Sequence, residues 1–317
     1  KKSGRLIFNI GLMQMKQVSE TAKGIFCIIT SAFCFALMAV FVRLSGDIHF
    51  VQKAFFRNAV AFFIAVFLLL KEIRHNGVEV ISVTKQSLLF LFLRSITGSV
   101  GVFGNFYAID RILLSDAAIL NKMAPFFAII FSFVIMKEKI KLVPLMAIIT
   151  AFLGSMLIVK PSFDFSKTVP TLAAFAGGMG AGFAYACVRK LSVLKCNSKL
   201  IVLFFSAFSM LLSVPYMIVS FNPMSFTQIL FLVLAGICAA GGQFSITAAY
   251  YHAPARDISI YDYSQLIFST LLGFIFFAQI PDIYSFIGYI VIISMAVLNF
   301  LWNRNQHKIK KNQNKKL

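Results

Sequence analysis

Ten long apolar blocks follow one another through almost the whole chain. They occupy residues 24–42, 53–70, 87–107, 113–136, 142–159, 170–188, 200–220, 227–249, 257–279 and 282–302. Crossing a hydrocarbon core takes roughly 20 helical residues, and each block is about that long. Of all residues 59% are hydrophobic and only 13% are charged, more apolar surface than a water-soluble fold can bury. The sequence therefore predicts an all-α integral membrane protein with ten transmembrane helices.

The basic residues give this helical protein an orientation. The formal net charge is +19, and most of the 30 Lys and Arg residues fall on one side if the chain crosses the membrane ten times. The other side holds only Arg43, Lys53, Arg111, Lys160 and Lys167. Since cytoplasmic loops are rich in Lys and Arg, we expect both termini to be cytoplasmic and the protein to lie in the inner (plasma) membrane. Because the Lys and Arg residues lie at helix ends and in the two tails, they indicate that the partner is a lipid bilayer and not a nucleic acid.

The connections between the blocks are too short to contain a soluble domain. No Gly-rich phosphate-binding loop ending in Gly-Lys-Ser or Gly-Lys-Thr occurs, which argues against a pump driven by nucleotide hydrolysis. Five cysteines and four histidines are scattered, without the spacing of metal ligands. We therefore predict no metal site and no cofactor.

An internal repeat divides the chain into halves. Residues 105–158 laid over residues 246–299 match Ala108 with Ala249, Phe127 with Phe268 and Phe133 with Phe274. Five crossings per half is an odd number, so the second half must enter the membrane from the opposite face. Such inverted repeats are typical of secondary transporters, whose substrates bind near the midplane. We expect repeats at 23–160 and 161–303, preceded by a segment at 1–22 and followed by a basic tail at 304–317.

Short motifs along residues 22–302 resemble those of the drug/metabolite transporter superfamily, in particular ten-helix carriers with two EamA-type repeats. The motifs are Phe55-Phe56-Arg57, Leu93-Arg94-Ser95-Ile96-Thr97-Gly98, Phe106-Tyr107-Ala108, Ser115-Asp116-Ala117-Ala118, Lys137-Glu138-Lys139, Ala248-Ala249-Tyr250-Tyr251 and Pro254-Ala255-Arg256-Asp257-Ile258-Ser259. The arginines of the first two motifs look like those of a subgroup that includes S-adenosylmethionine uptake carriers and related organic-anion carriers. The resemblance implies two five-helix units and a carrier function.

Ionisable residues inside the blocks are candidates for function, because each costs roughly 2.5–3.5 kcal/mol to insert at the centre of a transmembrane helix. Arg94 shares a helix face with Asn105, and Arg57 lies near the start of its block. Either side chain could bind substrate. Alternatively, Arg94 ties helix ends together and Arg57 extends to the outer interface. The glycines on the face of Arg94 favour close helix packing.

Asp262 is the carboxylate placed deepest within a block, which we expect to be one continuous helix over residues 257–279. It could couple transport to protons, or form an ion pair with Arg94 or Lys122. Lys122 and Asn121 precede Pro125, a residue that frees a backbone carbonyl and kinks a helix.

Other polar or aromatic residues could complete a site. Glu138 is a candidate gate that could pair with nearby lysines, and the candidates for substrate binding are Arg57, Arg94, Asn105, Tyr107, Asn121, Lys122, Gln243, Tyr250, Tyr263 and Gln265. Tyr185 could also line a cavity.

Three basic groups against one buried carboxylate favour an anionic or zwitterionic ligand. The prediction is a secondary transporter, monomeric or homodimeric, that moves a small metabolite by alternating access, with protons as a possible coupling ion. A membrane-embedded transferase is an alternative, but it would need clustered Asp or paired His residues that the chain lacks. A channel is the other alternative, although one chain shows no repeated pore ring.

Overall fold

The structure, a computed structural model, describes residues 2–109, 111–112, 114–138, 141–161, 168–278 and 280–316. Side chains are described throughout these ranges except for residues 2–19, 109, 114–116 and 307–316. Helices account for almost all of this part of the chain and no strand occurs in it. Ten helical spans are long and apolar enough to cross a membrane, as the sequence predicts.

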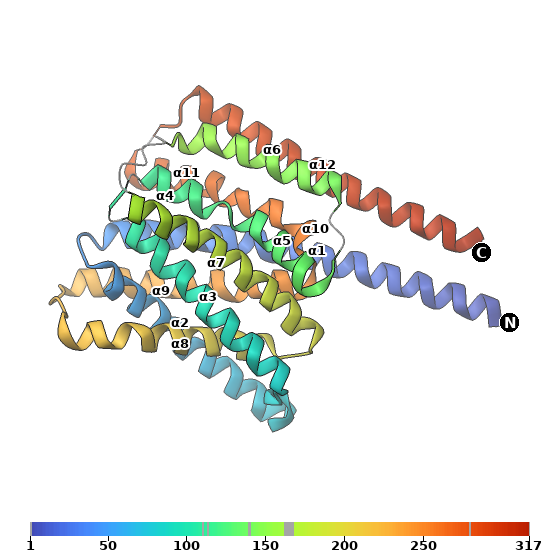
Figure 1. The fold of residues 1–317 in the computed structure, drawn as a ribbon, viewed down its shortest axis with the longest axis horizontal. Helices are drawn as coiled ribbons and strands as arrows, with labels where there is room; N and C mark the ends of the chain where they lie inside the picture. The colour runs from blue at the N-terminus through green and yellow to red at the C-terminus, as the bar shows by residue number, and fades with distance from the viewer. Residues whose placement is uncertain are drawn as a thin grey trace.

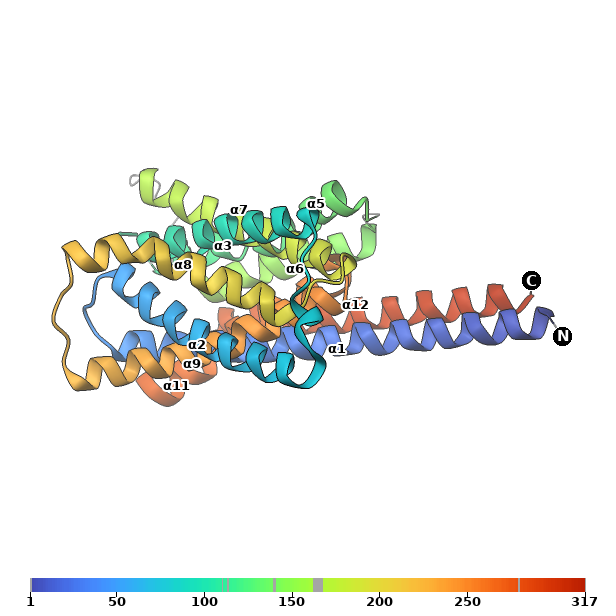
Figure 2. The same cartoon turned by 90° about the horizontal axis from the view of Figure 1, so that it is seen from below.

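Figure 1 shows the spans lying side by side, with both termini at the same end of the bundle. We call this the terminal end and the other the far end. The helices are α1 (Lys2–Leu44), α2 (Phe50–Asn76), α3 (Lys85–Ile109), α4 (Leu114–Asn121), α5 (Ala124–Met136), α6 (Leu142–Val159), α7 (Thr168–Val193), α8 (Ser198–Val219), α9 (Phe226–His252), α10 (Ala255–Ile258), α11 (Ser264–Phe277) and α12 (Ile283–Lys316), with 3₁₀ helices η1 (Val78–Ile81) and η2 (Ser259–Tyr263). Helices α1 and α12 extend beyond the bundle at the terminal end (Figure 2).

The fourth span is broken between α4 and α5. Pro125 lies in the first turn of α5 and has no N–H to donate. The N–H groups of Phe126 and Phe127 both bind the carbonyl of Met123, so the carbonyl of Lys122 lies outside the helical ladder. This interruption lies at the proline where the sequence predicts a kink and a freed carbonyl.

The ninth span is also broken, contrary to the expectation of one helix over residues 257–279. It consists of α10, the 3₁₀ helix η2 and α11, although residues 255–264 contain no proline or glycine. Asp262 thus lies in the 3₁₀ segment, whose side chains follow a different rotation from those of an α-helix. The carbonyl of Asp262 accepts a hydrogen bond from Lys122 of the fourth span, so this segment is tied to the other half of the chain.

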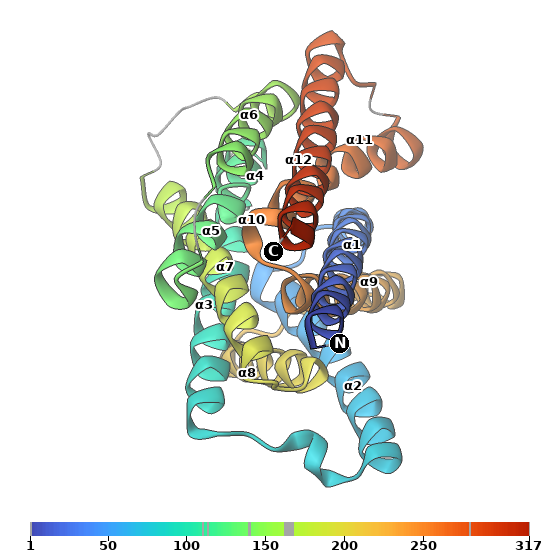
Figure 3. The same ribbon diagram turned by 90° about the vertical axis from the view of Figure 1, so that its right-hand side faces the viewer.

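Neighbouring spans from the two halves pack in pairs. Helix α3 packs along α7, α1 along α9, α2 along α8, and α6 along α12. Seen along the bundle, α3, α5 and α7 lie on one side and α1 and α9 on the other (Figure 3). Glycines permit the closest approach: a Cβ added at Gly104 would lie 2.5 Å from the carbonyl oxygen of Ala173 in α7.

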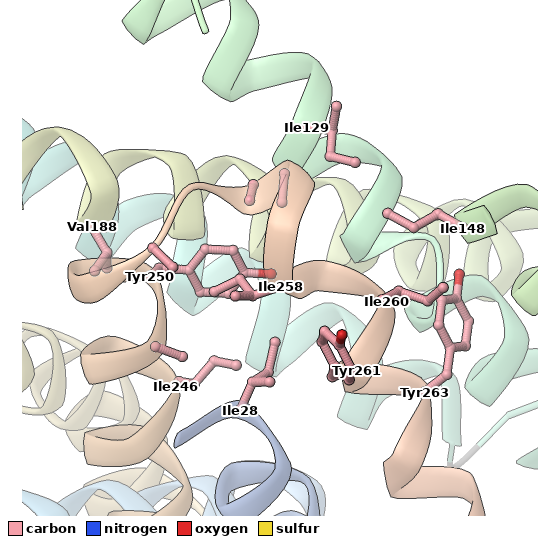
Figure 4. Packing of buried hydrophobic residues seen from close by; sticks show 14 of the residues in the cluster. Ile28, Ile129, Ile148, Val188, Ile246, Tyr250, Ile258, Ile260, Tyr261 and Tyr263 are labelled. Atoms are coloured by element: carbon pink, nitrogen blue, oxygen red, sulfur yellow. The ribbon is translucent and has the colours of Figure 1, made fainter. Parts of the chain in front are cut away.

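The main cluster of buried apolar residues lies toward the terminal end. Its members include Ile28 of α1, Leu91 of α3, Val188 of α7, Ile201 of α8 and Ile246 of α9, each in the part of its helix nearer that end. Figure 4 shows Ile28, Val188 and Ile246 around Tyr250 and Ile258. Toward the far end the described residues form two smaller, separate clusters: Ala36, Val40 and Leu272, and Ala108, Ala117 and Ala174.

Candidate functional site

A cavity of about 140 Å³ lies between the two broken spans. Eight of the polar residues singled out in the sequence line it: Arg57, Arg94, Asn105, Asn121, Lys122, Gln243, Asp262 and Gln265. Phe35, Met38, Phe106, Tyr185 and Phe205 are among the remaining lining residues. Residues from both halves therefore form one polar cavity inside an apolar bundle.

Lys122 is tied to the opposite half by all three of its ammonium hydrogens. Its Nζ donates to Asp262 Oδ2 at 2.9 Å, to the Asp262 carbonyl at 3.2 Å and to Gln265 Oε1 at 2.7 Å. The Lys122 and Asp262 side chains are only 9% and 12% exposed. Since an ammonium has three donors, Lys122 has none left for a ligand in this conformation.

A second bond returns across the same junction. The hydroxyl of Tyr263 donates at 3.1 Å to the carbonyl of Lys122, the group released by the break between α4 and α5. Each broken span thus satisfies a backbone carbonyl of the other, as buried polar groups require. Tyr263, a candidate for substrate binding from the sequence, is fully buried and is not among the residues lining the cavity; it lies at the junction beside it.

Arg57 and Arg94 have a different environment from Lys122. Arg94 is 2% exposed, and its guanidinium carbon lies 4.1 Å from the centre of the Phe205 ring. Arg57 lies 5.9 Å from the centre of the Phe35 ring. Within the described part of the chain, neither guanidinium has an ion-pair or hydrogen-bond partner, and both Nε atoms are buried. Aromatic faces compensate such charges only in part.

Tyr185 and Tyr250 stack between the cavity and the terminal end, with ring centres 4.7 Å apart and planes 10° from parallel. Tyr185 lines the cavity. Tyr250, which the sequence placed in the ligand site, lies behind it, and its hydroxyl is 3.1 Å from Ser259 Oγ. Helical periodicity predicts Tyr250 on the same helix face as Gln243, but the ring of Tyr185 lies between Tyr250 and the cavity.

Two further candidates lie away from the cavity. Tyr107 is near the far end of α3, where the Arg111 guanidinium carbon sits 3.8 Å from its ring centre. Glu138 is at the terminal end and accepts a hydrogen bond from Arg189 Nε at 3.1 Å. Its partner among the described residues is thus an arginine of the other half, and Lys139, one of the lysines near it in sequence, lies outside the described residues. Arg189 also donates to the carbonyl of Tyr251 at 3.3 Å, which links the ends of α5, α7 and α9.

Phe205 was missed by sequence reasoning. It is one of 37 phenylalanines, and nothing in its local sequence marks it as the one that packs against a buried arginine. Its role depends on α8 lying next to α3, which a single sequence does not reveal.

Comparison with known proteins agrees with this architecture. Residues 22–160 match the model of the EamA-like transporter family. The chain is 28% identical to the pseudopaline exporter CntI of Pseudomonas aeruginosa over 276 residues, 86% of this chain and 94% of that protein. It is 27% identical to human solute carrier family 35 member G1 over 291 residues, 86% of this chain and 78% of that protein.

A solved crystal structure has the same fold. Its TM-score with this chain is 0.76 at 16% sequence identity, over 90% of this chain and 99% of the other. The match of residues 22–160 to the EamA-like transporter family, the transporter names of the relatives and the ten apolar spans together support a multi-pass membrane transporter with an EamA-like unit at residues 22–160.

Proposed function

We propose that the chain is a secondary transporter that moves a small anionic or zwitterionic metabolite across the cytoplasmic membrane by alternating access. The observation that carries this proposal is the cavity at the junction of the two broken spans, where Arg57 and Arg94 have no acidic partner in the described part of the chain. A ligand carboxylate would form charge-assisted hydrogen bonds with these guanidinium groups. Broken helices that meet at a central site are a recurrent feature of such carriers.

Helix packing supports two inverted units at residues 23–160 and 161–303. The third span packs on the sixth and the first on the eighth, so exchanging the halves turns one contact into the other. The second span packs on the seventh and the fifth on the tenth, and these pairs map onto themselves. A pseudo-two-fold axis in the membrane plane requires this pattern. With both termini cytoplasmic, the terminal end of the bundle faces the cytoplasm.

Asp262 is our candidate for coupling transport to protons. Its carboxylate is held by Lys122, so proton uptake would have to accompany the opening of that ion pair. Opening the pair would also release the carbonyl of Asp262, which joins the two broken spans. Protonation and movement of the halves would therefore be linked through one side chain.

The experiment uses purified protein in two steps. A thermal-shift screen against amino acids, nucleosides, S-adenosylmethionine and organic acids first identifies a ligand. Proteoliposomes loaded with that ligand should then take up labelled ligand with saturable kinetics and be stimulated by ligand on the opposite side. The paired variant Arg57→Gln/Arg94→Gln should lose this uptake, while Arg74→Gln, at an exposed position of α2, should retain it. Flux that rises linearly with concentration and shows no counterflow would support a channel instead.

A further inference from the structure

We propose that the substrate carries two acid groups and enters the cavity as a dianion. This inference rests on the proposed transport function and narrows the substrate class of the same site. It follows from which lining charges are already compensated and which are not. The four ionised side chains among the described lining residues are Arg57, Arg94, Lys122 and Asp262.

One pair of these charges is already neutral. The 2.9 Å contact between Lys122 Nζ and Asp262 Oδ2 joins a cation to an anion, and the other two ammonium hydrogens bind the Asp262 carbonyl and Gln265 Oε1. A ligand carboxylate could reach Lys122 only by displacing one of these acceptors. Similarly, the ammonium of a zwitterion would meet a carboxylate that is already paired.

The two guanidinium groups carry the remaining charge, which amounts to two positive charges beside one cavity. Arg94 is 2% exposed, and the Nε atoms of both arginines are buried without a hydrogen-bond partner. The Nε2 of Gln243, a third buried donor in the lining, also lacks a partner among the described residues. Leaving buried charges and donors unpaired is costly. The lining of the cavity therefore presents donors that no described residue of the chain satisfies, and these match an acceptor-rich ligand.

The number of acid groups follows from this surplus. A ligand with one carboxylate, or a zwitterion with one carboxylate and one ammonium, would leave at least one of the two guanidinium groups without a counter-charge. Two carboxylates, or another pair of acid groups on one small molecule, would neutralise both arginines and leave the Lys122–Asp262 pair intact. Transport without a compensating ion would then carry charge across the membrane.

Matched acids and amides test the charge requirement directly. Purified protein in chloride-free buffer would be titrated with succinate, succinamate and succinamide, and with the corresponding series built on glutarate and phthalate. Within at least one series, we expect the diacid to bind tenfold or more tightly than its mono-amide. If no diacid binds the wild-type protein, or if the amides bind equally well in every series, the inference is overturned.

Variants of the arginines provide an independent measurement. Arg94→Met and Arg57→Met should each abolish the preference for the diacid. Each should also raise the thermal unfolding temperature of the ligand-free protein by a few degrees, because each removes an uncompensated charge whose Nε is buried without a partner. Arg74→Met, on the exposed end of α2, should change neither quantity. If the arginines only hold helices together, both Met variants would instead lower the unfolding temperature, and this result would overturn the inference.

The two proposals fail in distinguishable ways. Saturable counterflow of a mono-acid or a zwitterion, without preference for diacids, would leave the transport function standing and remove this inference. Diacid binding without counterflow would support the dianionic substrate class and contradict the proposed transport function.

Discussion

The Arg94 guanidinium is held between the ring of Phe205 and the backbone of its own helix at Gly98. A Cβ added at Gly98 would lie 2.2 Å from Arg94 Nη1 and 2.9 Å from a ring carbon of Phe205. Both distances are too short for real carbon contacts, so either the arginine or the ring would have to move. Glycine at this position therefore lets a long charged side chain fold against α3 while still lining the cavity.

We predict that Gly98→Ala lowers the free energy of unfolding by about 1–3 kcal/mol, the usual cost of overpacking. Gly241→Ala is the matched control, because its new Cβ would meet only Cys34, with Sγ at 3.2 Å. Both substitutions replace glycine by alanine within a helix and so gain the same helix propensity. The difference between their free energies of unfolding therefore measures the cost of steric crowding. Denaturant unfolding in detergent gives the two values, and equal stability of the two variants would contradict the prediction.

Cys196 lies between α7 and α8, outside the spans, and is 1% exposed. Burial raises the pKa of its thiol to about 11, against a smaller lowering by a backbone hydrogen bond from Asn197. Only the thiolate reacts with maleimides. A thiol with a raised pKa stays protonated at neutral pH and gains reactivity only as the pH approaches that pKa.

We therefore expect no labelling of Cys196 by N-ethylmaleimide at pH 7.5 in folded protein whose four other cysteines are replaced by alanine. A second variant that also lacks Cys196 and carries Asn76→Cys, at an exposed position, should react within minutes. Unfolding in dodecyl sulfate should make Cys196 reactive. Mass spectrometry measures the adducts, and equal rates in the two folded variants would show that the thiol is accessible.

At the scale of elements, the two broken spans depend on each other. Lys122 supplies donors to η2, and Tyr263 supplies one to the carbonyl freed in front of α5. The junction consequently joins the two halves beside the cavity. Any movement of one half relative to the other would change these hydrogen bonds.

Breaking the ion pair from one side should be more harmful than removing it. We predict that Lys122→Met costs about 3–5 kcal/mol of stability, because it leaves a buried carboxylate without its cation. The double variant Lys122→Met/Asp262→Asn should recover most of this loss. Chemical unfolding of the wild type, both single variants and the double variant gives the coupling energy. Additive effects would mean that the two side chains do not stabilise each other.

For the whole molecule, the uneven distribution of the core indicates which end is closed. The main apolar cluster and the Glu138–Arg189 ion pair lie toward the terminal end. At the far end the described apolar clusters are small and separate, one on α1 and α11 and the other on α3, α4 and α7. The cavity lining extends in that direction along α3 as far as Phe106.

We predict that a cysteine replacing Phe106 is labelled by a membrane-impermeant thiol reagent applied from the far side. A cysteine replacing Val188, within the apolar cluster, should be protected from both sides. Both variants are made in a chain without other cysteines, and sealed vesicles of known orientation separate the two sides. Labelling of Val188→Cys from the terminal side, with Phe106→Cys protected, would show that the opposite end is open.

The sequence by itself determined the ten spans, and its motifs resemble those of the EamA-type carriers, whose family model residues 22–160 match. It also picked out most of the polar residues that line the cavity. These are local properties: a run of apolar residues must enter the bilayer wherever it lies, and a charge within such a run must face protein or water. A kink at Pro125 was equally predictable, because proline removes a hydrogen bond from its own helix.

Only the tertiary structure decided which of these residues meet. Lys122 and Asp262 lie 140 positions apart, and the sequence left Arg94 open as an alternative partner. The 3₁₀ segment Ser259–Tyr263 contains no proline or glycine that would predict it, and the lysine that binds one of its carbonyls comes from another span. Likewise, the position of Phe205 over Arg94 and of Tyr185 over Tyr250 depends on which helices are neighbours. Such contacts follow from packing across the bundle, on which local periodicity carries no information.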